Sequence, residues 1–197
     1  MPAPDPERDH WLRRIDATGS AQARYLWLLL VLGLFFAALA VRGSTDQNIT
    51  VPVVDLELNA SLVLAAGAPV LAFLVLAAMG AIRAWTHALE QFRGAKPGTD
   101  AEQLDTSPNA LDLAMYTTED SPRPVRILLS FVYPTYLSAV LVESAWLWAW
   151  VWRTSDVAGR SAFLISGAVA WLPATLLVLA MWLKRIKQIP EHPRRGV

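Results

Sequence analysis

Four long apolar runs stand between the polar stretches of the chain. Bounded by charged residues, they hold 17, 25, 26 and 23 residues, the third being counted across Glu143. A helix needs about 20 residues to cross roughly 30 Å of hydrocarbon. None of the runs alternates apolar and polar positions with a period of two, as the strands of a membrane barrel do. The pattern predicts an all-α polytopic membrane protein with four transmembrane helices, at about residues 25–42, 60–83, 127–152 and 161–183.

Three of these predicted helices contain a proline: Pro69, Pro134 and Pro173. In a water-soluble helix each would cost about 3 kcal/mol, because proline lacks an N–H donor and its ring crowds the preceding turn. Inside a bundle, neighbouring helices supply partners for the freed carbonyls. We interpret the prolines as packing kinks, with a hinge or gate as the alternative.

Lysine and arginine are divided unequally between the predicted sides of the membrane. The two tails and the second loop hold 14 of the 17, whereas the first and third loops hold 3. By the positive-inside rule, both termini are predicted to be cytoplasmic. A signal peptide ending at Ala40 is the alternative for the first run, but the long, acidic segment before it argues against this. The predicted parts are a cytoplasmic tail (1–23), a membrane domain (24–187) with a cytoplasmic loop at about 85–124, and a second cytoplasmic tail (188–197).

Two predicted loops have patterns of their own. Apolar and acidic residues alternate over 54–58, which predicts one short extended segment or a small hairpin on the outer membrane surface. We interpret this outer loop as an ordered connector, with a docking strand for a partner as the alternative. The cytoplasmic loop permits an amphipathic continuation of the second helix through Phe92, and a further short helix around residues 104–116.

Composition narrows the function classes. The chain is 54% hydrophobic and 17% charged, against roughly 25% charged in soluble domains, which favours lipid as the solvent. The net charge of zero provides no basic excess for a nucleic-acid partner. The absence of cysteine excludes a thiol nucleophile, a disulfide scaffold and a cysteine-ligated zinc site. Nucleotide-binding and hydrolase motifs are also absent, so we expect no cofactor and no enzymatic activity.

The three histidines add no metal or haem site to this interpretation. His10, His87 and His192 all belong to the predicted cytoplasmic side, so no two predicted spans carry facing haem ligands. His87 and Glu90 together provide too few ligands for a metal ion. We therefore expect no metal.

Glu143 is the one ionisable residue inside a predicted span. A charge near the bilayer centre costs about 2.5–3.5 kcal/mol or more, so such a residue is a candidate functional group. Its position, ten residues before Arg153, also allows a place near the outer interface. Three roles remain open: an interfacial or inter-helix hydrogen bond, an ion or proton site, and a partner contact.

Trp146, Trp148, Trp150 and Trp152 recur at every second position. On a helix, 146 and 150 share one face while 148 and 152 lie on the other side, so the four form no single stripe. We interpret them as an aromatic belt at the outer interface, joined by Trp171. Contact with a pigment, quinone or sterol is the alternative.

Small residues mark the first two predicted helices. Gly33, Gly67 and Gly80 are accompanied by many alanines, and small side chains allow membrane helices to approach closely. The segment Ala65–Pro69 is the expected site of a tight helix crossing.

Several short motifs resemble a known bacterial module. They are ARYL, STD, VPVVDLEL, APVL, WLPATLL and WLK, at residues 23–26, 44–46, 51–58, 68–71, 171–177 and 182–184. In this order the chain resembles the uncharacterised four-helix membrane module that is found ahead of pentapeptide repeats, although here no repeats follow. The resemblance implies a bacterial inner-membrane location and supplies no catalytic residue.

The leading functional expectation is an accessory or scaffolding subunit in the bacterial inner membrane. It would bind other proteins through its tails and cytoplasmic loop. The alternative is an oligomeric channel or small transporter that uses Glu143. A membrane-disrupting effector is the third class.

Overall fold

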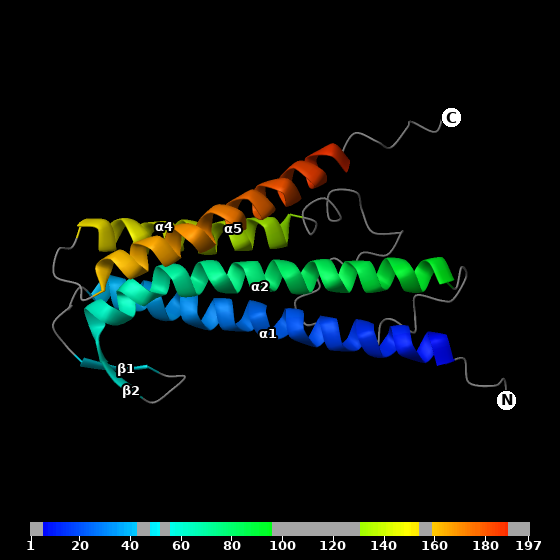
Figure 1. Ribbon diagram of the computed structural model, residues 1–197, viewed down its shortest axis with the longest axis horizontal. Helices are drawn as coiled ribbons and strands as arrows, with labels where there is room; N and C mark the ends of the chain where they lie inside the picture. Colours follow the sequence, from blue (N-terminus) through cyan, green and yellow to red (C-terminus); the bar gives the residue numbers. More distant parts are fainter. Residues whose placement is uncertain (1–5, 43–47, 52–55, 96–130, 154–158, 189–197) are drawn as a thin grey trace. The chain divides into compact units, whose positions relative to one another are not determined.

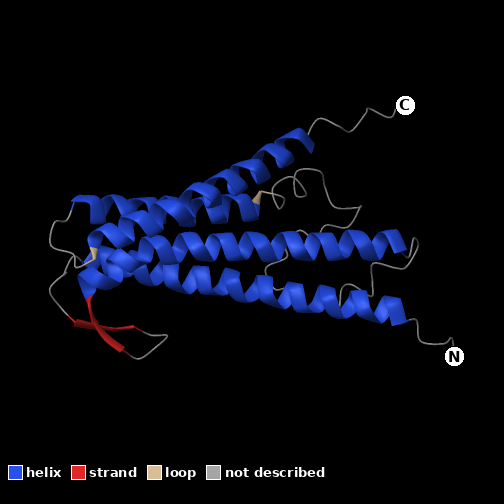
Figure 2. Ribbon diagram, viewed as in Figure 1, coloured by secondary structure: helices blue, strands red, loops and turns tan. Residues whose placement is uncertain are grey.

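The computed structural model describes residues 6–42, 48–51, 56–95, 131–153 and 159–188. Contacts divide the chain into unit 1 (1–27 and 77–130) and unit 2 (28–76 and 131–197). Each unit is described by itself, and the first two helices contribute to both. The elements, shown in Figures 1 and 2, are α1 (Pro6–Arg42), β1 (Asn48–Val51), β2 (Leu56–Asn59), α2 (Ala60–Ala95), α4 (Val132–Arg153) and α5 (Arg160–Gln188).

Three of the four described helices are long and apolar enough to cross a membrane. The qualifying segments are Asp9–Val41 in α1, Ala60–Phe92 in α2 and Arg160–Lys184 in α5. The 22 residues of α4 reach about 33 Å, so its length is sufficient. α4 is not among these three; it contains four tryptophans, two tyrosines and Glu143. The helical fold is thus confirmed, while a fourth span and the orientation of the termini stay predictions.

Unit 1 extends both helices well beyond the predicted spans. α1 begins at Pro6, inside the segment predicted as a tail, and α2 runs to Ala95, inside the predicted loop. The predicted continuation of the second helix through Phe92 is therefore confirmed, whereas the helical N-terminal segment was not foreseen. The expected helix at 104–116 lies outside the described residues, as does the predicted tail at 188–197 except for Gln188, which ends α5.

A small apolar cluster explains why these extensions are helical. Ile15, Ala88, Leu89 and Phe92 are buried together. Side chains three and four residues apart share a helix face, so one face of each helix can bury its apolar residues against the other. The residues that pack around this cluster are Trp11, Leu12 and Trp85.

The buried positions of α1 recur every three or four residues along its whole length. Such spacing matches the heptad period of helices that pack side by side at a shallow angle. The stripe includes two glycines and one polar residue, Gln22, which is only 2% exposed. Its members are Ile15, Gly19, Gln22, Leu26, Leu29, Gly33, Phe36 and Leu39.

Unit 2 contains the tight crossing that the small residues predicted. A Cβ added to Gly67 would lie 2.8 Å from Leu147 Cδ1 and 3.0 Å from the ring of Phe36. Here the backbone of α2 therefore lies close to side chains of both α1 and α4, which would have to shift to admit a larger residue. The hydroxyl of Ser144 on α4 donates a buried hydrogen bond of 2.8 Å to the carbonyl of Ala68.

In the same unit, α4 and α5 lie alongside each other (Figure 1). Three indole N–H groups join them: Trp148 donates to the Leu164 carbonyl at 3.0 Å, Trp171 to the Leu141 carbonyl at 3.3 Å, and Trp182 to Ser138 Oγ at 3.0 Å. These tryptophans are partly buried, and an indole N–H removed from water usually takes such an acceptor, so the bonds fix how the two helices align.

The segment between α1 and α2 forms a hairpin, one of the two forms that the sequence pattern predicts. β1 and β2 pair antiparallel, with Asn48 opposite Asn59 and Val51 opposite Leu56. β2 ends at Asn59 and α2 begins at the next residue. Asn59 Oδ1 accepts hydrogen bonds from the backbone N–H and the hydroxyl of Ser61. This is an N-cap, which satisfies a donor that the first helical turn leaves free.

Candidate functional site

Glu143 lies near the middle of α4, as the twelfth of its 22 residues. A Cβ added to Gly33 of α1 would lie 3.1 Å from Glu143 Oε2, so the carboxyl group occupies the space that this glycine leaves open. Its other oxygen, Oε1, is buried and accepts no hydrogen bond from the described residues. Glu143 is therefore an inter-helix residue facing α1, not one at the end of its helix.

This arrangement limits the roles of Glu143. A buried carboxylate oxygen without a donor is destabilising while the group is charged, so it favours uptake of a proton or a cation. The sequence identified Glu143 and Gly33 separately, but only the fold brings them together. The periodicity of α1 contained the signal, because Gly33 belongs to its buried stripe.

The four predicted belt tryptophans have different environments. Trp146 and Trp152 are 51% and 59% exposed. Trp150 packs against the cluster of Ala65 and Val151, while Trp148 is hydrogen-bonded to α5 and stacks on Trp152. The expectation of no single stripe agrees with these positions. A belt at a membrane interface remains a prediction, and two of its members also pack between helices.

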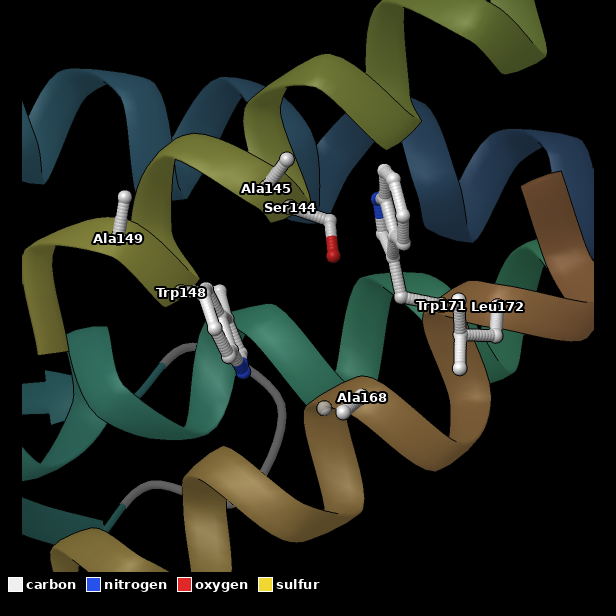
Figure 3. Close-up of a pocket in the computed structure, with 8 residues that line it drawn as sticks. Ser144, Ala145, Trp148, Ala149, Ala168, Trp171 and Leu172 are labelled. Atoms are coloured by element: carbon white, nitrogen blue, oxygen red, sulfur yellow. The ribbon is translucent and has the colours of Figure 1, made fainter. Parts of the chain in front are cut away.

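A cavity of about 440 Å³ lies between α4 and α5. Figure 3 shows the rings of Trp148 and Trp171 on either side of the Ser144 hydroxyl. All three of these polar side chains already donate to backbone carbonyls, of Leu164, Leu141 and Ala68. The other lining residues are Ala145, Ala149, Gly167, Ala168 and Leu172.

The prolines lie in two kinds of position. Pro69 and Pro173 are inside α2 and α5, as predicted. Pro134, by contrast, is the third residue of α4 as described. The N–H groups of a first turn have no partner within the helix, so Pro134 interrupts no helical bond there. The sequence predicts an interior kink at Pro134 because the apolar run begins at residue 127, whereas the described helix begins at Val132.

Neither the histidines nor the acidic residues form a metal site in the described segments. His10 is exposed and its ring contacts Trp11 edge-on, and His87 is exposed on α2. Among the described residues, no group of three or more histidine, cysteine, aspartate and glutamate side chains is close enough to hold a metal ion. His192 lies outside these residues.

Comparison of the chain with protein-family models, curated proteins and solved structures finds no match. The resemblance to the four-helix bacterial module therefore stays a prediction, as do its implied location and the expected function.

Proposed function

We propose that this chain is an integral membrane protein with four spans and both termini in the cytoplasm. It acts without enzymatic activity as an accessory subunit that binds partner proteins. The observation that carries the proposal is unit 1, a pair of helical segments with its own small apolar core and charged exposed residues. Unit 1 includes the predicted N-terminal tail and the predicted cytoplasmic loop at about 85–124. Together with the C-terminal tail, these are the proposed contact regions.

The lengths of α1 and α2 support this assignment. They contain 37 and 36 residues, or about 55 Å each, whereas the hydrocarbon core is about 30 Å thick. The excess of roughly 25 Å matches the charged segments of unit 1. In the bacterial cytoplasm, a helical segment of this kind would present side chains from an already ordered backbone. Binding of a partner would then cost little conformational entropy.

The topology has a direct test because the chain contains no cysteine. Single cysteines are introduced at three exposed helical positions by Ser20→Cys, Ser161→Cys and Lys184→Cys. With a membrane-impermeant maleimide on intact cells, we expect labelling of Ser161→Cys alone. The other two become reactive after permeabilisation. Opposite accessibility of Ser20→Cys and Lys184→Cys would show an odd number of spans and contradict the four-span proposal.

Partner binding is tested by purifying the chain in mild detergent. We expect a second protein at fixed stoichiometry, lost when the charges of unit 1 are reversed by Arg13→Glu with Glu90→Lys. Both residues are exposed, so the core should remain intact. Arg153→Glu, an exposed reversal in unit 2, is the matched control and should retain the partner. Purification of the chain without any partner, alone or as a homo-oligomer, would contradict the accessory role.

The second candidate is an oligomeric channel or transporter. It is favoured by Glu143 Oε1, which is buried and accepts no hydrogen bond within the described part of the chain. Four spans form a pore only when several chains assemble. Proton and potassium flux into liposomes is compared between the native chain and Glu143→Gln, which keeps the side-chain shape and removes the charge. A loss of flux in the variant supports this candidate, while equal flux in both, or none in either, contradicts it.

A further inference from the structure

The cavity between α4 and α5 has the size of a ligand site. Its volume of about 440 Å³ falls within the roughly 300–1,000 Å³ typical of small-molecule pockets. Two features create it within unit 2. The indole bonds of Trp148 and Trp171 hold the two helices at a fixed separation, and the side chains between them are small.

The chemistry of the walls limits what the cavity can hold. Its polar side chains are the Ser144 hydroxyl and two indoles, and each already donates to a backbone carbonyl. A quinone or another ligand with polar ring substituents would bury oxygens without donors, which costs several kcal/mol. A saturated hydrocarbon chain requires no such partner and gains from contact with indole faces.

The surroundings of the cavity indicate the source of that chain. Leu172 lines the cavity and is also 58% exposed on the outer face of α5. On that face, exposed apolar residues recur every three or four positions along the helix, as expected for a surface in contact with lipid. The cavity is therefore continuous with this stripe, whose members are Ile165, Val169, Leu172, Leu176, Leu179, Leu183 and Ile186.

We propose that the α4–α5 cavity is a binding site for one acyl chain of a membrane phospholipid, which enters past Leu172 and lies between Trp148 and Trp171. The inference goes beyond the proposed accessory role and rests on the membrane location alone. The bound chain fills space that the two helices leave empty and stabilises their alignment. It therefore acts as a structural lipid of unit 2.

The test uses the full chain in phosphatidylcholine vesicles that contain phosphatidylcholine with a diazirine in the middle of one acyl chain. After illumination, peptide mass spectrometry measures labelling of the cavity indoles, Trp148 and Trp171. Trp146, which is exposed on α4, is the reference of the same residue type. We expect Ala168→Phe, which fills the cavity, to abolish labelling of both cavity indoles and to leave Trp146 labelled.

Ala180→Phe is the matched control, because Ala180 is exposed on the same helix and does not line the cavity. It should leave all three tryptophans labelled as in the native chain. If Ala168→Phe fails to fold, Ala149→Leu fills the same space from α4. After transfer into detergent, the native chain should also retain more phospholipid per protein than the filled variant.

The proposal would be overturned by three results. The first is no labelling of Trp148 and Trp171 in the native chain, and the second is equal labelling in the filled variant. The third is cross-linking of the cavity to a second copy, which would show that a protein helix occupies it. These outcomes are independent of partner capture by unit 1, so the accessory role and the lipid site fail separately.

Discussion

The two units of this chain bury the same kinds of side chain but differ in what they expose. Of the 18 exposed large hydrophobic residues in the described segments, 17 belong to unit 2, the exception being Trp27 at the edge of unit 1. Unit 1 instead exposes charged residues on both of its helical segments, among them Arg13, Arg14, Arg83 and Glu90. One pair of continuous helices therefore passes from a surface suited to lipid to a surface suited to water.

The units also differ in what holds their helices together. Unit 1 buries large apolar side chains, and burial of such surface is favourable where the alternative is water. In lipid this driving force between helices is absent, so close packing and inter-helix hydrogen bonds must replace it. Unit 2 contains both: the glycine contacts at Gly33 and Gly67, and the bonds donated by Ser144 and three tryptophans.

The largest expected effect comes from a mutation that truncates a side chain in the core of unit 1. Phe92 is 3% exposed, and Phe92→Ala should destabilise the packing of unit 1 by about 3 kcal/mol, through lost burial and the cavity that remains. Hydrogen exchange should then accelerate at residues 8–20 and 85–92, with unit 2 unchanged. Gln91→Ala, at the exposed neighbouring position, is the control. Faster exchange throughout both units would show that they unfold as one and would remove the distinction between them.

The next effect concerns the glycine contacts of unit 2. Gly67→Leu forces a side chain against Leu147 and Phe36 and should destabilise the bundle by about 2–3 kcal/mol. Gly80→Leu is the matched control, because a Cβ at Gly80 meets no atom within 4 Å. Unfolding in mixed micelles measures the difference. Equal stability of the two variants would mean that close approach at Gly67 does not hold unit 2 together.

The smallest effect concerns a single inter-helix hydrogen bond. Ser144→Ala removes the donor to the Ala68 carbonyl, and bonds of this kind in membrane bundles contribute about 0.6 kcal/mol on average. A double-mutant cycle with a substitution at Ala68 would be uninformative, because the acceptor is backbone. The same micelle assay therefore compares Ser144→Ala with Ser161→Ala, an exposed serine on α5. A loss as large as that of Gly67→Leu would rank hydrogen bonding above packing in unit 2.

The long apolar runs of the sequence predict the four helices, and the alternation over 54–58 predicts a hairpin as one of two forms. The continuation of α2 through Phe92 is also predicted. The sequence did not predict the helix over residues 6–24. No long apolar run covers these residues, and the helix is stabilised there because Ile15 and its neighbours pack on residues far along the chain. The described start of α4 likewise changed Pro134 from an interior kink to a first-turn residue.

Some features of the candidate site are likewise visible in the sequence, whereas others appear only in the tertiary structure. Composition alone identified Glu143, since a single acidic residue in an apolar run is visible without any structure. The sequence could not show that Glu143 faces Gly33, nor that two tryptophans 23 positions apart, Trp148 and Trp171, line one cavity. The hydrophobic pattern determines which segments are helical and which solvent they suit, because both depend on local spacing and composition. Which faces meet depends on how side chains far apart in the chain interlock, and only the tertiary structure decides that.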